Sequence, residues 1–202
     1  MSGLANRPLF SYNDAMPRPQ ENLGKGKMLV TMAFFISSVL NLPLILAAMA
    51  SQTMREPARV MRVINGDTLT ILYRGRYEEI TLIGVDAPET TMNDKTYEDA
   101  LRQSTSPDTI IDWGNRSGDF VKHFLGYGSQ IWLEFDIQKR DRFNRLLGYV
   151  FLPSGTLLNE LLLKEGYASL LLIPPNLRYR DRLSEASRLA IRNRKGLRAA
   201  NP

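Results

Sequence analysis

The sequence predicts an α+β domain that is mainly β, built as a five-stranded barrel of the OB-fold type with about three packed helices. Two observations predict this class. Short runs between residues 60 and 151 have strand-like patterning and are separated by turn residues, and helical spacing is concentrated in the second half of the chain. The OB-fold is the commonest small closed barrel of this kind. One hydrophobic helix is expected before the domain.

The predicted strands are defined by their turns. Residues 60–63 lead into an Asn65-Gly66 turn, and residues 68–73 alternate before the hairpin turn at Arg74-Gly75-Arg76. Further strands are expected at 79–85, 130–135 and 146–151, and Pro153-Ser154-Gly155 is a turn signal after the last one.

Three helices are expected, at 117–125, 157–165 and 180–193. Gly166 is a C-cap signal for the second helix, and the third has apolar residues on one face. The polar stretch 90–114 has few apolar residues and is predicted to be a mobile loop or insertion.

The N-terminal part divides into three segments. Residues 1–27 are expected to be a disordered polar tail, and residues 28–50 carry no charge and are long enough to cross a membrane as a helix. A single-pass anchor is favoured, with the following domain on the non-cytoplasmic side. The alternative is a signal peptide cleaved near Ala50, because Ala48-Met49-Ala50 resembles a cleavage site. A linker is expected at 51–57 and the globular domain at 58–202.

Composition narrows the possible chemistry. The net charge of +5 and pI of about 9.6 suit a polyanion or an anionic membrane surface, although a basic surface that binds neither is equally compatible. The chain has no cysteine and one histidine, which excludes disulfides, a cysteine nucleophile and a structural zinc site. His123 has helical neighbours and is expected on a helix surface. Chemistry must therefore use carboxylates, guanidinium groups, hydroxyls or an oxygen-ligated metal.

Two short acidic motifs are the strongest candidates for such chemistry. One is Asn65-Gly66-Asp67-Thr68, and the other is Ile-Gly-Val-Asp-Ala-Pro-Glu at 83–89, which contains Asp86 and Glu89. A hard divalent cation takes carboxylate and carbonyl oxygens, and a carboxylate can also orient an attacking water. Each aspartate taken alone is more typical of a turn.

The sequence resembles the staphylococcal nuclease (thermonuclease-like) family over about residues 58–198. The first acidic motif resembles the family's Asp-Gly-Asp-Thr turn, with Asn65 in place of the first aspartate. The other motifs follow in the same order as in the family, and the resemblance rests on this shared order. The matching segments are 60–68, 82–89, 141–150, 158–168 and 184–197.

The resemblance implies an OB-fold nuclease that hydrolyses DNA or RNA with one Ca²⁺ ion. It implies that Asp67, Asp86 and the backbone carbonyl of Ala87 bind the ion. Glu89 would act as general base or position the water, and Arg145 would contact the phosphate.

Four other positions concern the substrate. Thr81 stands where the family has an arginine that clamps the phosphate, and a hydroxyl cannot replace a bidentate guanidinium. Phe143 and Leu171 stand in place of tyrosines that contact the phosphate and stack on a base. Arg142 beside Phe143 is a candidate for compensation, although a solvated arginine is the more ordinary interpretation.

Three functions remain open from the sequence. The first is a nuclease, weakened by the change at Thr81 and attached to a membrane or exported. The second is a catalytically degraded nuclease fold that serves as a binding or assembly module of a membrane complex. The third is nucleic-acid binding without hydrolysis.

Overall fold

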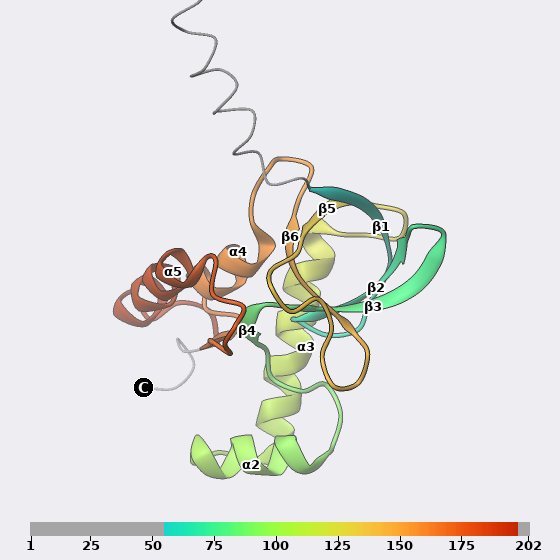
Figure 1. Ribbon diagram of the computed structural model, residues 1–202. Coiled ribbons are helices and arrows are strands. Elements are labelled where there is room, and N and C mark those ends of the chain that lie inside the picture. Colours follow the sequence, from blue (N-terminus) through green and yellow to red (C-terminus); the bar gives the residue numbers. More distant parts are fainter. Residues whose placement is uncertain (1–54, 198–202) are drawn as a thin grey trace, which may run out of the picture. The chain divides into compact units, whose positions relative to one another are not determined.

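Five strands close into a barrel in the computed structural model, which describes residues 55–197 (Figure 1). The strand order is β1-β2-β3-β6-β5, and all neighbours are antiparallel except β3 and β6. The predicted barrel is confirmed. Its strands are β1 (Glu56–Val63), β2 (Thr68–Tyr73), β3 (Arg76–Leu82), β5 (Gln130–Glu134) and β6 (Leu146–Phe151). The domain therefore includes Glu56 and Pro57, which were predicted to be linker.

The strand predicted at 79–85 is divided in two. β3 ends at Leu82, and β4 (Gly84–Asp86) leaves the barrel to pair with β7 (Ser169–Leu171). Gly84 has a φ of +80°, and a Cβ there would lie 2.4 Å from a methyl of Leu183. Only glycine adopts this conformation without strain and leaves room for that side chain. The break turns the second acidic motif away from the barrel wall.

Four helices accompany the barrel within residues 55–197: α2 (Asp94–Arg102), α3 (Pro107–Phe124), α4 (Leu158–Lys164) and α5 (Arg180–Arg192). The prediction of a loop at 90–114 is wrong, because α2 and the first part of α3 lie there. The side chains of Asn93 and Ser106 cap these helices, and Pro107 begins α3. A small second core holds them, formed by Ala100, Ile110, Trp113 and Leu197.

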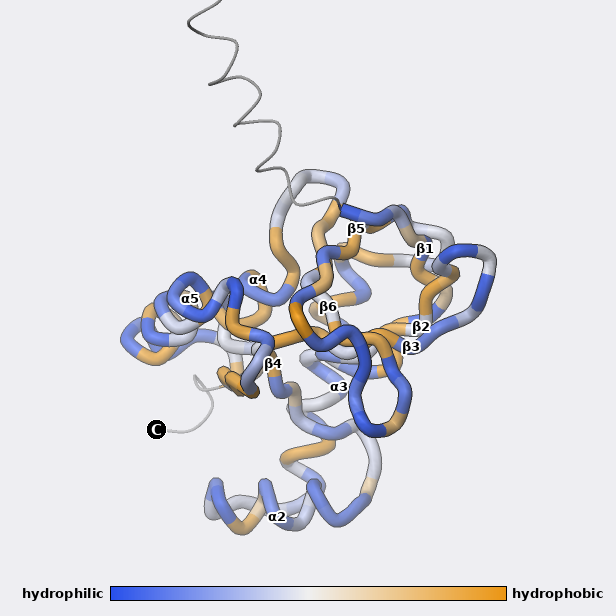
Figure 2. Tube along the Cα trace, in the orientation of Figure 1, coloured by the Kyte–Doolittle hydropathy of each residue, from blue (hydrophilic) through white to orange (hydrophobic). Residues whose placement is uncertain are grey.

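Apolar side chains from alternate strand positions fill the barrel. Leu69, Ile71, Ile80, Ile131 and Leu133 are fully buried there, together with residues of α4. Figure 2 shows the hydrophobic residues concentrated on the strands, while most of α2 is hydrophilic. The hydrophobic effect therefore stabilises the barrel directly, whereas α2 depends more on polar contacts.

The predicted tail at 1–27 and the hydrophobic segment at 28–50 lie outside the described residues. Between residues 55 and 197, none of the helices has both the length and the apolar character needed to span a membrane.

Candidate functional site

The two acidic motifs meet at a cleft of about 630 Å³. Asp67 comes from the turn between β1 and β2, Asp86 ends β4, and Glu89 follows it. Thr81 of β3 and Arg145, just before β6, line the same cleft. The structure thus brings together residues that are up to 78 positions apart in the sequence.

Asp67 joins the two motifs. Its carboxylate accepts a hydrogen bond from Thr68 Oγ1 at 2.8 Å and another from the backbone N–H of Ala87 at 2.7 Å. Burial raises the pKa of Asp67, while these two hydrogen bonds act in the opposite direction. Asn65 shapes the turn itself, because its Oδ1 accepts from the N–H groups of Asp67 and Thr68 at 3.2 and 2.8 Å. The asparagine therefore has a clear structural role.

Helix α3 supports both motifs through two glycine contacts. A Cβ on Gly66 would lie 1.9 Å from Ser117 Oγ, and a Cβ on Gly114 would lie 2.1 Å from the carbonyl oxygen of Glu89. Real contacts of this kind do not fall below 3.0 Å. Glycine at both places lets α3 approach the backbone of the site.

Asn159 fixes the start of the second motif from the other side. It is fully buried, and its Nδ2 donates to the carbonyl oxygens of Ile83 and Gly148 at 2.8 and 3.3 Å. Its Oδ1 accepts from the N–H of Val150 at 3.0 Å. These bonds connect α4 and β6 to the point where the chain leaves the barrel, so they set the direction of β4.

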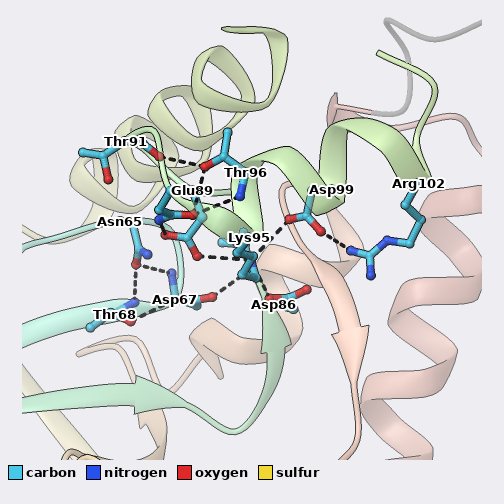
Figure 3. Close-up of polar contacts among 12 residues, drawn as sticks. Asn65, Asp67, Thr68, Asp86, Glu89, Thr91, Lys95, Thr96, Asp99 and Arg102 are labelled. Carbon is cyan, nitrogen blue, oxygen red and sulfur yellow. Dashed lines mark hydrogen bonds and ion pairs between the residues drawn. The ribbon is translucent and has the colours of Figure 1, made fainter. Parts of the chain in front are cut away.

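Lys95 places its ammonium group among the acidic residues, as Figure 3 shows. Its Nζ lies 3.1 Å from Asp86 Oδ1, 3.2 Å from Glu89 Oε1 and 3.4 Å from Asp99 Oδ2. It also donates to the carbonyl oxygen of Ala87 at 3.3 Å. Burial lowers the pKa of Lys95, but the neighbouring carboxylates outweigh this effect, so the pKa lies above its usual value.

This arrangement bears directly on metal binding. Asp86, Ala87 and Glu89 offer oxygen atoms of the type that Ca²⁺ prefers. Those same oxygens contact the ammonium of Lys95, and both oxygens of Asp67 already accept hydrogen bonds. Across residues 55–197, no three carboxylate or histidine side chains are gathered so that they could hold an ion. The predicted ligands are close together, but they do not fit a divalent cation while Lys95 lies between them.

Arg145 is held in the cleft by Asp141. Its Nε donates to Asp141 Oδ2 at 2.8 Å, and Asp141 Oδ1 accepts from the N–H groups of Phe143 and Arg145, both at 2.9 Å. Burial raises the pKa of Asp141, but the bonds with Arg145 and Phe143 hold it below its usual value. The terminal guanidinium nitrogens of Arg145 have no hydrogen bond within residues 55–197, so they are available to an anion.

Thr81 lines the cleft with a neutral side chain. Its Oγ1 is buried and has no hydrogen-bond partner among the described residues. Arg140 cannot supply the positive charge as it stands, because it binds both oxygens of Glu78 at 2.9 Å and the carbonyl of Asn144 at 2.7 Å. Arg142 stays close to Phe143, with its guanidinium carbon 4.7 Å from the ring centre.

Three of the predicted substrate positions line the cleft together: Arg142, Phe143 and Leu171. Phe143 is 65 % exposed and Leu171 is 43 % exposed, so both can be reached from solvent. Leu171 comes close because β7 pairs with β4, which places it opposite Gly84. His123 is exposed on the surface of α3, as predicted, and it is not among the residues that line this cleft.

A family model described as Staphylococcal nuclease homologue matches residues 79–199, more than half of the chain. The chain belongs to the staphylococcal nuclease family. It is similar to a thermonuclease of Staphylococcus hyicus, with 34% identity over 140 residues, which cover 69% of this chain and 73% of the relative. A thermonuclease of Staphylococcus intermedius is 35% identical over 132 residues, covering 65% and 69%. Endonuclease YncB of Bacillus subtilis is 32% identical over 123 residues, covering 59% and 51%.

The staphylococcal nuclease fold therefore accounts for the barrel and for the order of the motifs. Sequence reasoning missed three residues of the site: Lys95, Asp99 and Asn159. The first two lie in the stretch expected to be a loop. The local helix signals there are the Asn93 cap, Asp94 in the first turn and Arg102 in the last turn. Asn159 was recognised as part of a family motif, but nothing local indicated which backbone groups it binds.

Proposed function

We propose that this staphylococcal nuclease family member is a phosphodiester hydrolase that cleaves DNA or RNA. The observation that carries the proposal is that Glu89 and Arg145 line the same cleft, and that, within residues 55–197, the Arg145 guanidinium hydrogen-bonds to Asp141 through Nε alone. The names of the relatives, thermonuclease and endonuclease, support the same class of reaction.

The chemistry follows from these two groups. Glu89 orients a water molecule and accepts its proton as the water oxygen bonds to phosphorus. The bond from phosphorus to the leaving oxygen breaks, and that oxygen takes a proton from solvent to leave as an alcohol. Negative charge grows on the non-bridging oxygens during this step. Arg145 donates two charge-assisted hydrogen bonds to those oxygens, in an orientation that Asp141 has already fixed.

Calcium dependence is the finer part of the proposal. Asp67, Asp86 and the carbonyl of Ala87 are the proposed ligands, and the ion would add positive charge beside the phosphate. Lys95 contacts two of these ligands, Asp86 and the Ala87 carbonyl. For this reason the hydrolysis steps described above are assigned to residues of the chain and not to the ion.

The rim of the cleft supports a nucleotide substrate. Phe143 offers an exposed aromatic face on which a base can stack, and Arg142 beside it offers positive charge. Leu171 provides apolar contact without a π-face.

We further propose that residues 28–50 attach the protein to a membrane, with the domain on the non-cytoplasmic side, or are removed near Ala50 on export; a cell-fractionation experiment tests this.

A second function is favoured by the lack of positive charge at Thr81, where a phosphate would bind. Thr81 supplies no charge where the family has an arginine, and Lys95 lies among the proposed metal ligands. Both changes suit a degraded nuclease fold that serves as a binding or assembly module of a membrane complex.

A nuclease assay separates the two functions. The full chain is incubated with single-stranded DNA or RNA, with Ca²⁺ or with a chelator, and acid-soluble nucleotide is measured. Glu89→Gln should lower kcat by a factor on the order of 10²–10⁴, because it removes the base while keeping the size of the side chain. The control is Glu98→Gln on the exposed surface of α2. Absence of any Glu89-dependent cleavage under both conditions would favour the binding module.

A further inference from the structure

Lys95 is an unusual residue for its position in α2. It is the second residue of the helix, which begins at Asp94 after the Asn93 cap. The N-terminus of a helix carries partial positive charge, so a cation in the first turn is unfavourable unless other groups offset it. Asp86, Glu89 and Asp99 are those groups, and two of them come from outside the helix. Tertiary contacts therefore hold this lysine in place.

The oxygens around the ammonium coincide with those expected around a metal ion. Two of the proposed Ca²⁺ ligands, Asp86 and the Ala87 carbonyl, contact Nζ at 3.1 and 3.3 Å. Calcium requires oxygens at about 2.3–2.6 Å. An ion bound to the same oxygens would lie against the ammonium, and two like charges cannot share that volume.

Asp99 holds Lys95 from the far side. It lies four residues along α2, its side chain is 6 % exposed, and it pairs with both Lys95 and Arg102. It is not one of the proposed metal ligands. Asp99 therefore stabilises the ammonium of Lys95 but would not contribute a ligand to a metal ion in the cleft.

The lysine can also move away. Its side chain is 37 % exposed, so rotation of the stem into solvent is open to it. We propose that Lys95 is an internal cation that competes with a divalent metal ion for Asp86 and the Ala87 carbonyl. Bound Ca²⁺ displaces the ammonium, and the ammonium in turn weakens Ca²⁺ binding.

This inference concerns the same site as the proposed hydrolase but does not depend on hydrolysis. The test measures Ca²⁺ binding to the full chain, purified free of divalent cations, by isothermal titration calorimetry. Tb³⁺ luminescence excited through aromatic residues provides a second readout. The variant is Lys95→Met, which keeps an apolar stem of similar length. The matched control is Lys122→Met on α3, where the lysine pairs with Asp119 at 2.9 Å and is 57 % exposed.

Lys95→Met should bind Ca²⁺ at least about tenfold more tightly than the wild type, because three partly exposed ion pairs no longer compete. Lys122→Met should match the wild type. Adding Asp86→Asn to Lys95→Met should remove the gain, which locates the ion at this site. Equal affinity in the wild type and in Lys95→Met overturns the proposal, and so does a folded Lys95→Met variant that binds no Ca²⁺.

If Lys95→Met does not fold, Asp99→Asn provides the decisive comparison. This variant keeps the ammonium but removes one of its anchors, so Ca²⁺ affinity should rise by about threefold. Unchanged affinity in Asp99→Asn would then refute the competition. Since each readout is metal binding, a chain that cleaves no nucleic acid still gives a clear result.

Discussion

Gly114 is where α3 touches the backbone of Glu89, and Gly114→Ala tests whether this contact sets the active geometry. An alanine Cβ would lie 2.1 Å from the Glu89 carbonyl oxygen and 2.8 Å from that of Pro88. Such contacts do not fall below 3.0 Å, so the helix and this segment must separate by about 1 Å.

The two effects on stability have opposite signs. Alanine in a helix interior gains about 0.5–1 kcal/mol over glycine. Overpacking against the backbone costs about 1–3 kcal/mol. We expect a net loss of about 1–2 kcal/mol in the free energy of unfolding, which lowers the Tm by roughly 2–8 °C in a domain of this size. A shift of Glu89 by about 1 Å should lower nuclease activity about 10²-fold.

Gly118→Ala is the matched control in the same helix. A Cβ at Gly118 would lie 3.8 Å from Asn65 Cα, which is ordinary contact. This variant should be unchanged or more stable by up to about 1 kcal/mol, with normal activity. Urea unfolding followed by far-UV circular dichroism measures both variants. Equal stability and activity in Gly114→Ala and Gly118→Ala would show that the contact at Gly114 does not set the geometry of the site.

Two further predictions concern the phosphate side of the cleft. Thr81→Arg removes an unpartnered buried hydroxyl and adds a guanidinium to the cleft that Arg145 also lines, so kcat should rise by about 10- to 10³-fold. Tyr77→Arg, an exposed position on the same strand, is the charge control, and equal activity in the two would contradict a missing clamp. Asp141→Asn should destabilise the protein at pH 7, because the folded pKa of Asp141 lies below its usual value of 3.8. A depressed carboxyl pKa contributes stability above the unfolded pKa and loses it as the pH falls through the folded value, so the difference from wild type should shrink below about pH 4. A constant difference between pH 7 and pH 3 in urea unfolding would show that Asp141 does not act through its charge.

Much of this protein follows from local sequence. The alternation of 68–73 and the turn residues around Asn65 and Arg74 define a hairpin within a few residues, so β2 and its turns were predicted correctly. The acidic motifs were also identified, because each is a short contiguous run. Motif order then indicated the family, and the family match agrees.

Other features depend on residues that are distant in the chain. The predicted strand 79–85 reads as one element, yet Asn159 and Leu183 make it break at Ile83 and Gly84. The stretch 90–114 lacks strong apolar periodicity, since its helices bury only one small core, and so it resembled a loop.

The sequence by itself determined the β2–β3 hairpin and the two acidic motifs, because each of these is written in contiguous residues. Only the tertiary structure decided what lies between the acidic side chains. Lys95 is unfavourable at the start of a helix by local rules, and the carboxylates of Asp86 and Glu89 that stabilise it reach it only when the chain has folded. Electrostatic partners act through space, so their pairing cannot be read from spacing along the chain.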